Sequence, residues 1–186
     1  MMEARFKCLS QSLLLVAGLG IASCSDAQTP GLACFEVVGN KPQGIVEACS
    51  QAIESGAYKK ERLGEAYFNR GFSHYFLEDY EAAIDDYSEA LKRLPKNANV
   101  FSNRGAAFKK ALRLEEALDD FTRAVELDPN FANGHTGRGD VLYLMGRNED
   151  AVKAYAQALL IDPADDTALH NLSLVHKDMK KKAARR

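Results

Sequence analysis

The sequence has no apolar run long enough to cross a membrane as a helix, because its longest, residues 13–22, falls well short of the roughly 20 residues needed. It also lacks an excess of charge of one sign. The 24 lysines and arginines are balanced by 26 aspartates and glutamates, which leaves a net charge of −2. This balance gives no overall attraction to nucleic acid, so we expect no nucleic-acid partner. The apolar share of 46% is typical of a globular protein with a core.

Residues suited to catalysis or metal binding are sparse. His170 and His176 are six residues apart, whereas helical metal ligands are spaced four apart. No cysteine pair has a second pair or a nearby histidine to complete a metal site. No combination of a nucleophile with a base is recognisable. The sequence therefore predicts a protein that is not an enzyme, with no catalytic residue, no metal and no cofactor.

The first residues resemble an export signal. Two basic residues precede the apolar run at 13–22, as in a secretory signal. Residues 21–24, Ile-Ala-Ser-Cys, resemble a bacterial lipobox, which implies cleavage before Cys24, lipidation of Cys24 and anchoring to a membrane. Ser25 after that cysteine implies an outer-membrane or periplasm-facing lipoprotein of the cell envelope. The alternative is ordinary secretion with cleavage after Ala27, which gives a soluble periplasmic or secreted product.

Both alternatives leave two cysteines in the mature chain. Cys8 is removed with the signal, and Cys24 is either lipidated or removed, so Cys34 and Cys49 remain. An even pair in an oxidising compartment favours a disulfide. Closing a loop of about 15 residues would stabilise the fold by roughly 3 kcal/mol through lost chain entropy. The alternative is a pair of buried free thiols.

The dominant feature of the sequence is an internal repeat with a period of 34 residues. Residues 64–97 recur at 98–131 and again at 132–165. Such a period indicates a solenoid of helix–turn–helix units. The positions that recur hold small, aromatic and proline residues: Gly71, Gly105 and Gly139; Ala83, Ala117 and Ala151; Tyr87, Phe121 and Tyr155; Ala90, Ala124 and Ala158; Pro95, Pro129 and Pro163.

These residues resemble the tetratricopeptide repeat, whose pattern has a small residue at position 8, alanine at 20 and 27, an aromatic residue at 24 and proline at 32. Small residues allow the two helices of a unit to approach closely, and proline cannot continue the second helix. The resemblance implies an all-α fold, a right-handed superhelical solenoid of antiparallel helix pairs with about three repeat units and a capping helix at each end. It also implies a partner that is a protein or peptide.

The repeat divides the chain into segments. The apolar positions after Gly44 are spaced as on one face of a helix, which predicts an N-terminal capping helix. The expected segments are a signal peptide with lipobox at 1–23, a tether and lead-in at 24–43, a capping helix with linker at 44–63, repeats at 64–97, 98–131 and 132–165, and a C-terminal capping helix with a basic tail at 166–186.

In this family the first helices of the repeats line a concave groove that meets a peptide. The resemblance places ten residues of this sequence in the groove: Phe68, Asn69, Phe72, Tyr75, Phe76, Asn103, Lys109, Asn133, Asp140 and Tyr143. The aromatic residues of the first repeat either form an exposed anchor for a ligand or are covered by the N-terminal lead-in. The groups that clamp a C-terminal carboxylate in chaperone-binding members are mostly missing, because Phe68 and Phe72 replace lysine and asparagine. Asn103 alone fits that clamp, while Asn133 and Gly137 occupy its later positions.

Charged residues also recur at the repeat period. Arginine occupies position 7 in all three repeats, and aspartate occupies position 23 in the first two. The third repeat has Ala154 at position 23, and the helix that follows has Leu172 at position 7. We infer that each aspartate pairs with the arginine of the next repeat, Asp86 with Arg104 and Asp120 with Arg138. The alternative is solvated charges on helix faces.

These patterns predict an adaptor without chemistry of its own. It would act in the bacterial cell envelope, attached to the membrane through a lipidated Cys24, and bind a protein or peptide segment in the groove. A second hypothesis is an assembly protein that forms homo-oligomers through the aromatic face of its first repeat.

Overall fold

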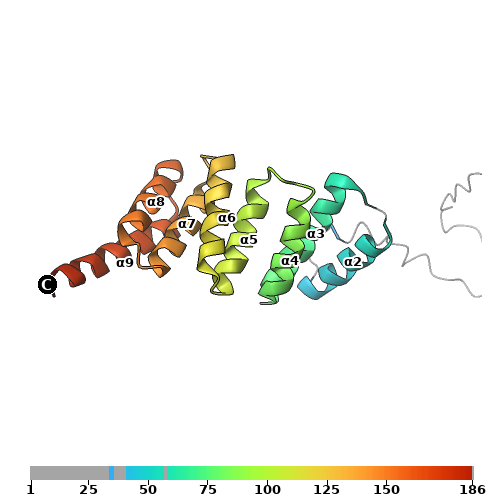
Figure 1. Cartoon of the computed structure of the whole chain (residues 1–186), viewed down its shortest axis with the longest axis horizontal. Helices are drawn as coiled ribbons and strands as arrows, with labels where there is room; N and C mark the ends of the chain where they lie inside the picture. Colours follow the sequence, from blue (N-terminus) through green and yellow to red (C-terminus); the bar gives the residue numbers. More distant parts are fainter. Residues whose placement is uncertain (1–33, 36–40, 57, 186) are drawn as a thin grey trace, which may run out of the picture.

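The structure is a computed structural model that describes residues 34–35, 41–56 and 58–185 (Figure 1). The predicted signal segment 1–23, the lipidation site Cys24 and the alternative cleavage site at Ala27 lie outside these ranges. Within the described ranges the chain forms α-helices and no strand, and none of the helices is both long and apolar enough to cross a membrane. The helices are α2 (Pro42–Glu54), α3 (Lys60–Phe76), α4 (Tyr80–Leu91), α5 (Ala98–Lys110), α6 (Leu114–Leu127), α7 (Ala132–Leu144), α8 (Asn148–Ile161) and α9 (Asp166–Ala183).

Consecutive helices pack side by side and form an elongated array (Figure 1). The three predicted repeats correspond to the antiparallel pairs α3/α4, α5/α6 and α7/α8. We call the first helix of each pair helix A and the second helix B. Helix α2 precedes the first pair and α9 follows the last. The all-α solenoid that the sequence predicts is confirmed.

The repeats are closely packed because the residues at the helix crossings are small. A Cβ atom placed on Gly71 would lie 3.1 Å from a side-chain atom of Asp86, and one on Gly139 would lie 2.6 Å from the ring of Tyr155. Each glycine lies close against helix B of its own repeat, so a larger residue at either position would push helices A and B apart. The aromatic rings of Tyr87 and Tyr155 are fully buried between the helices.

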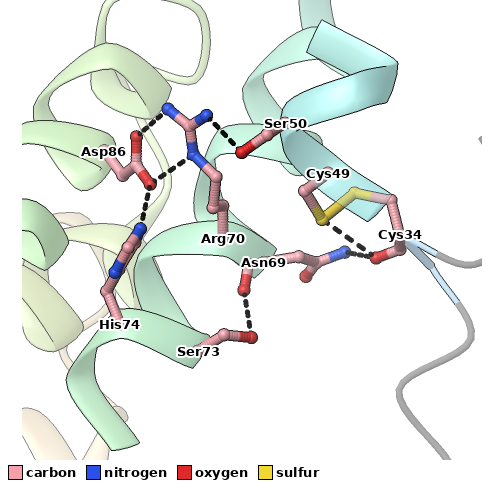
Figure 2. Close-up of a disulfide and its surroundings, with 8 residues drawn as sticks. All are labelled: Cys34, Cys49, Ser50, Asn69, Arg70, Ser73, His74 and Asp86. Carbon is pink, nitrogen blue, oxygen red and sulfur yellow. Dashed lines mark hydrogen bonds and ion pairs between the residues drawn. A yellow bond between two sulfur atoms is a disulfide. The ribbon is translucent and has the colours of Figure 1, made fainter. Parts of the chain in front are cut away.

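Helix α2 contacts α3 in the way that α4, a helix B, contacts α5. Its register follows from two matching hydrogen bonds. Arg70 donates to the Ser50 hydroxyl of α2 at 3.0 Å (Figure 2). Arg104 donates to the Ser88 hydroxyl of α4, also at 3.0 Å. Ser50 therefore corresponds to Ser88. In this register Cys49, the residue before Ser50, stands where the first repeat has its buried Tyr87.

Cys34 and Cys49 are joined by a disulfide, with their Cα atoms 4.6 Å apart (Figure 2). Both cysteines are fully buried, in a small apolar cluster with Ile45 and Ala52 of α2. The disulfide occupies the space that an aromatic ring fills in the complete repeats. The first of these repeats begins earlier than the 34-residue pattern suggests, since α3 starts at Lys60.

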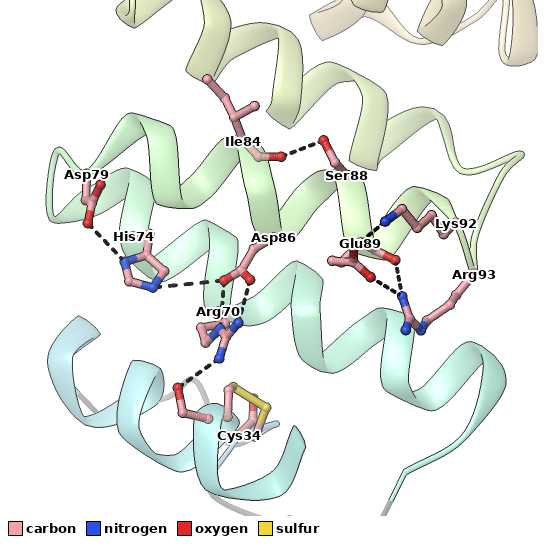
Figure 3. A network of polar contacts seen from close by, with 12 residues as sticks. Cys34, Arg70, His74, Asp79, Ile84, Asp86, Ser88, Glu89, Lys92 and Arg93 are labelled. Carbon is pink, nitrogen blue, oxygen red and sulfur yellow. Dashed lines mark hydrogen bonds and ion pairs between the residues drawn. A yellow bond between two sulfur atoms is a disulfide. The ribbon is translucent and has the colours of Figure 1, made fainter. Parts of the chain in front are cut away.

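The predicted pairing of aspartate with the arginine of the next repeat is wrong. Arg70 makes two hydrogen bonds to Asp86, at 2.7 and 2.8 Å (Figure 3), and Arg104 makes two to Asp120, at 2.8 and 2.9 Å. Each bidentate pair therefore joins helices A and B of one repeat, because positions 7 and 23 face each other across the antiparallel pair. The Asp86 bond raises the pKa of Arg70, whereas burial raises the pKa of Asp120 and the Arg104 bond opposes that rise.

Arg138 has no such partner, because its own repeat carries Ala154 at the facing position. Among the described residues Arg138 makes no hydrogen bond or ion pair, although it remains half-buried. Ala154 and Leu172 do belong to one apolar cluster around Tyr155. Arg104 instead reaches the preceding repeat through a hydrogen bond to the Ser88 hydroxyl.

Candidate functional site

The A helices α3, α5 and α7 lie next to one another along one face of the array, and α7 also contacts α9. We call this surface the A-helix face. Hollows open on it: one of about 250 Å³ between α5, α7 and the start of α9, and one of about 380 Å³ near the ends of α5 and α7. All ten groove residues predicted from the sequence lie on these A helices.

The α3 part of the A-helix face carries a row of aromatic rings that contact one another. The ring centroids of Phe68 and Phe72 are 6.3 Å apart, and those of Phe72 and Phe76 are 4.7 Å apart. Phe76 is 59% exposed, while Phe68, Phe72 and Tyr75 are half-buried. The described part of the lead-in reaches this helix at Asn69, whose side-chain amide donates to the carbonyl of Cys34 at 3.0 Å (Figure 2). The aromatic row is thus partly exposed beside the pinned lead-in.

The α7 part of the face is polar and is organised around Asp140. One of its carboxylate oxygens accepts hydrogen bonds from the Tyr155 hydroxyl and the Asn171 amide, each at 2.8 Å, and the other accepts one from the Lys109 ammonium at 2.6 Å. This network connects α5, α7, α8 and α9. Burial, together with Asp140, raises the pKa of Tyr155, so its hydroxyl stays protonated and remains a donor.

The structure brings together only part of the predicted groove set. Lys109, Asp140 and Tyr143 line one hollow, and Asn133 lines the other with Lys109 and Asp140. Tyr143 donates its hydroxyl to Asp178 of α9, which raises the pKa of the tyrosine. The side chain of Asn103 is hydrogen-bonded within its own helix, since its amide donates to the carbonyl of Asn99 at 2.8 Å.

Tyr155, Asn171 and Asp178 belong to this site although the sequence patterns did not assign them to it. A signal for Asn171 was present, since it occupies position 6 of the 34-residue register, as Asn69 and Asn103 do in their repeats. Tyr155 was assigned to the core through its aromatic ring. Its hydroxyl reaches the A-helix face because Asp140 stands at position 9 of the same repeat.

The equivalent tyrosine of the first repeat, Tyr87, has no acceptor for its hydroxyl among the described residues. The Tyr87 side chain is fully buried. Position 9 of that repeat is Phe72, which offers no acceptor. Burial raises the pKa of Tyr87, which keeps the hydroxyl neutral. The two tyrosines therefore occupy equivalent positions with opposite hydrogen-bonding states.

We expect Tyr87→Phe to raise the free energy of unfolding by about 1 kcal/mol, because it removes a buried donor that has no acceptor. Tyr155→Phe should lower it by about 1.5 kcal/mol, since Asp140 loses a charge-assisted bond. Urea denaturation of the two variants beside the wild type measures the difference. Equal effects of the two substitutions would contradict this account of the hydroxyls.

The A-helix face offers few groups that could hold a free carboxylate. Phe68 and Phe72 supply no cation, and Asn69 is bonded to the lead-in. Gly137 has no room for a side chain, because a Cβ atom there would lie 2.3 Å from the ring of Phe121. Lys109 is already paired with Asp140.

The described residues contain no group of three or more histidine, cysteine, aspartate or glutamate side chains arranged to hold a metal ion. His135 is buried, and its Nε2 lies 3.0 Å from the carbonyl oxygen of Pro129. Burial lowers the pKa of His135, which favours the neutral ring. Its contacts are those of a packing residue.

Comparison with protein families identifies the repeats. A model described as tetratricopeptide repeat matches residues 64–97 and 98–131. A second, described as TPR repeat, matches residues 139–180. These matches cover the first two pairs of helices and extend from α7 into α9.

Two curated proteins share a short segment with this chain. Stress-induced-phosphoprotein 1 of Caenorhabditis elegans is 37% identical over 62 residues, which is 33% of this chain and 19% of that protein. Hsp70-Hsp90 organizing protein of Triticum aestivum is 33% identical over 64 residues, 34% of this chain and 11% of that protein. The chain thus spans less than a fifth of either relative.

Solved structures show the same fold. The first repeat domain of Spaghetti (RPAP3), bound to the HSP90 peptide SRMEEVD, has a TM-score of 0.63 at 21% identity and covers 65% of this chain and 96% of that one. The second such domain of human RPAP3, in complex with the HSP70 peptide SGPTIEEVD, has a TM-score of 0.57 at 28% identity and covers 59% and 92%. Together with the family matches, the helix pairs show that this chain belongs to the tetratricopeptide repeat family.

Proposed function

We propose that this protein binds a peptide or protein segment along its A-helix face and acts as a scaffold without chemistry of its own. The observation that carries the proposal is the partly exposed row of Phe68, Phe72 and Phe76 on α3, which lies on the same A-helix face as the hollows beside α5 and α7. Exposed aromatic rings next to concave surface are typical of binding sites. The peptide complex of the human RPAP3 domain supports this use of the fold.

The proposed ligand is not a segment held by its free carboxyl terminus. A terminal carboxylate needs cations or several free donors, and the positions that would supply them hold Phe68, Phe72 and Gly137. The aromatic row instead favours apolar side chains of an internal segment. Specificity would come from apolar contacts along α3.

The proposed place of action is the bacterial cell envelope, with Cys24 lipidated or with a soluble product cleaved after Ala27. Support comes from the signal and lipobox patterns and from the Cys34–Cys49 disulfide, a bond that persists in oxidising compartments. Expression with labelled palmitate in a Gram-negative host tests the anchor. We expect label in the membrane fraction that Cys24→Ser abolishes, and an unlabelled soluble product would favour the alternative.

The binding proposal is tested by recovering partners from envelope extracts on immobilised protein. Phe72→Ala should lose the partners that the wild type retains, because it interrupts the aromatic row at its centre. Leu160→Ala is the matched control, since Leu160 is an exposed leucine on α8, a B helix. Circular dichroism would show that both variants stay folded. Equal recovery by Phe72→Ala and wild type would argue against the A-helix face as the binding site.

A further inference from the structure

We propose that the edge of the solenoid where the A helices end holds a specific pocket for a partner's peptide segment, one that presents a bulky apolar side chain next to a carboxylate. We call this surface the apolar edge and define it by Phe76, Leu112 and Leu144. The inference rests on the proposed function, because the edge borders the A-helix face, and it names the chemistry of the segment bound there.

The apolar edge is a row of exposed large side chains. Phe76 is 59% exposed, Leu112 80% and Leu144 57%. Phe76 and Leu144 are the last residues of α3 and α7, and Leu112 lies just after α5. Because the A helices run parallel along the array, their carboxyl ends follow one another on one side (Figure 1). One exposed apolar residue needs no explanation, but a row of three indicates an interaction surface.

Leu112 combines an exposed side chain with an unfavourable backbone conformation. Its φ is +61°, in the left-handed region that disfavours side chains, and the same turn position holds Glu78 with φ +62° in the first repeat and Gly146 with φ +76° in the third. Glycine would fit the turn of the second repeat equally well. What distinguishes Leu112 is its apolar side chain, which is 80% exposed where the other two repeats have glutamate and glycine.

A pocket of about 380 Å³ separates Leu112 from Leu144. Tyr143 adds an aromatic wall, and Asp140 forms part of the polar lining. The carboxylate of Asp140 is already bonded to three protein donors, so this part of the lining demands no polar atom from a ligand. The volume suits one or two bulky side chains.

The charge at the pocket indicates which kind of residue should stand next to the apolar side chain in the bound peptide. Lys110 is exposed, lines the pocket and makes no hydrogen bond or ion pair with any described residue. Lys109 and Asp140, the other charged lining residues, neutralise each other at 2.6 Å. The uncompensated charge is therefore positive, and a carboxylate beside the inserted apolar side chain is its complement.

The test uses the full chain and the peptide GSEFLDELSG, which carries fluorescein on its amino terminus and an amide at its carboxyl terminus, and follows binding by fluorescence anisotropy. We expect saturable binding that weakens about tenfold or more in Leu112→Gly. This variant should be at least as thermally stable as the wild type, since glycine suits the left-handed turn. Leu160→Ala, which changes an equally exposed leucine on α8, should bind like the wild type.

A charge exchange makes the test specific. Lys110→Glu should weaken binding of the acidic peptide by about tenfold. It should bind the charge-reversed peptide, GSKFLKKLSG, more tightly than the wild type does. Identical affinities for both peptides in Lys110→Glu and wild type would overturn the assignment of the carboxylate. An absence of binding at millimolar peptide, with envelope partners still lost on Phe72→Ala, would overturn the pocket and leave the proposed function standing.

Two further outcomes also decide the matter. Peptide binding that Phe72→Ala abolishes and Leu112→Gly leaves intact would place the peptide on the aromatic row, against this proposal. A concentration-dependent mass increase in light scattering that Leu112→Gly removes would show that a second copy of the chain covers the edge, which also contradicts it.

Discussion

Replacing Gly137 with alanine is expected to lower the free energy of unfolding by about 2 kcal/mol, although alanine is the better helix former by roughly 1 kcal/mol. A Cβ atom on Gly137 would lie 2.3 Å from Cε1 and 2.5 Å from Cζ of Phe121. The Phe121 ring is only 2% exposed and cannot turn away freely. Overpacking of this kind costs about 1 to 3 kcal/mol, and the severity of this contact places it at the upper end. Urea denaturation measures the loss.

Gly44 provides the matched control. It also lies inside a helix, α2, but a Cβ atom there would meet nothing within 4 Å. Gly44→Ala should therefore raise stability, by up to about 1 kcal/mol. Combining Gly137→Ala with Phe121→Leu should recover part of the loss, because the smaller side chain vacates the contact. A Gly137→Ala variant as stable as the wild type would show that the Phe121 ring can move aside without lowering the free energy of unfolding.

The contact also explains why this chain cannot bind ligands through a side chain at position 6 of its third repeat. The aromatic residue of the second repeat extends into that space, so only glycine fits at 137. The first repeat has Asn69 at position 6, and that residue binds the lead-in. Position 6 of these two repeats is therefore used for contacts within the protein and is not available to a ligand. For this reason the binding proposal rests on the aromatic side chains of α3.

The sequence predicted the architecture because the repeat period is a local and redundant signal. Small residues, aromatic residues and prolines recur in all three units, so each unit confirms the others. The groove positions came from the family resemblance, carried over in the same register, and the structure places Lys109, Asp140 and Tyr143 around one hollow. Periodicity shows which helix face a residue occupies, and that is enough to locate a surface.

Periodicity does not show which neighbour a side chain reaches. Arg104 lies between its own helix B and that of the preceding repeat, and both carry an aspartate at position 23. The pattern alone could not separate Asp120 from Asp86 as its partner. The structure resolves this, since Arg104 bonds Asp120 and reaches the preceding repeat through Ser88. Helix α2 does not show the full repeat pattern, because Cys49 stands in it where helix B of each repeat has an aromatic residue.

Loss of the Cys34–Cys49 disulfide is expected to destabilise the amino-terminal end of the array by about 3 kcal/mol. The bond closes a loop with a sequence separation of 15 residues, and releasing that loop restores entropy to the unfolded chain. The Cys34→Ser, Cys49→Ser double variant also places two hydroxyls where both side chains are now fully buried. Because the energetics of a repeat array are approximately those of neighbouring units, the effect should concentrate on α2 and α3.

Hydrogen exchange followed by mass spectrometry measures this distribution. Amides of α2 should exchange faster in the double variant by about a hundredfold, as a loss near 3 kcal/mol implies. Amides of α8, at the far end of the array, should be unchanged (Figure 1). A reducing agent should reproduce the change in the wild type and have no further effect on the variant. Uniform acceleration along the whole array would show that the disulfide stabilises the fold globally, and unchanged exchange in α2 would show that its packing against α3 suffices without the bond.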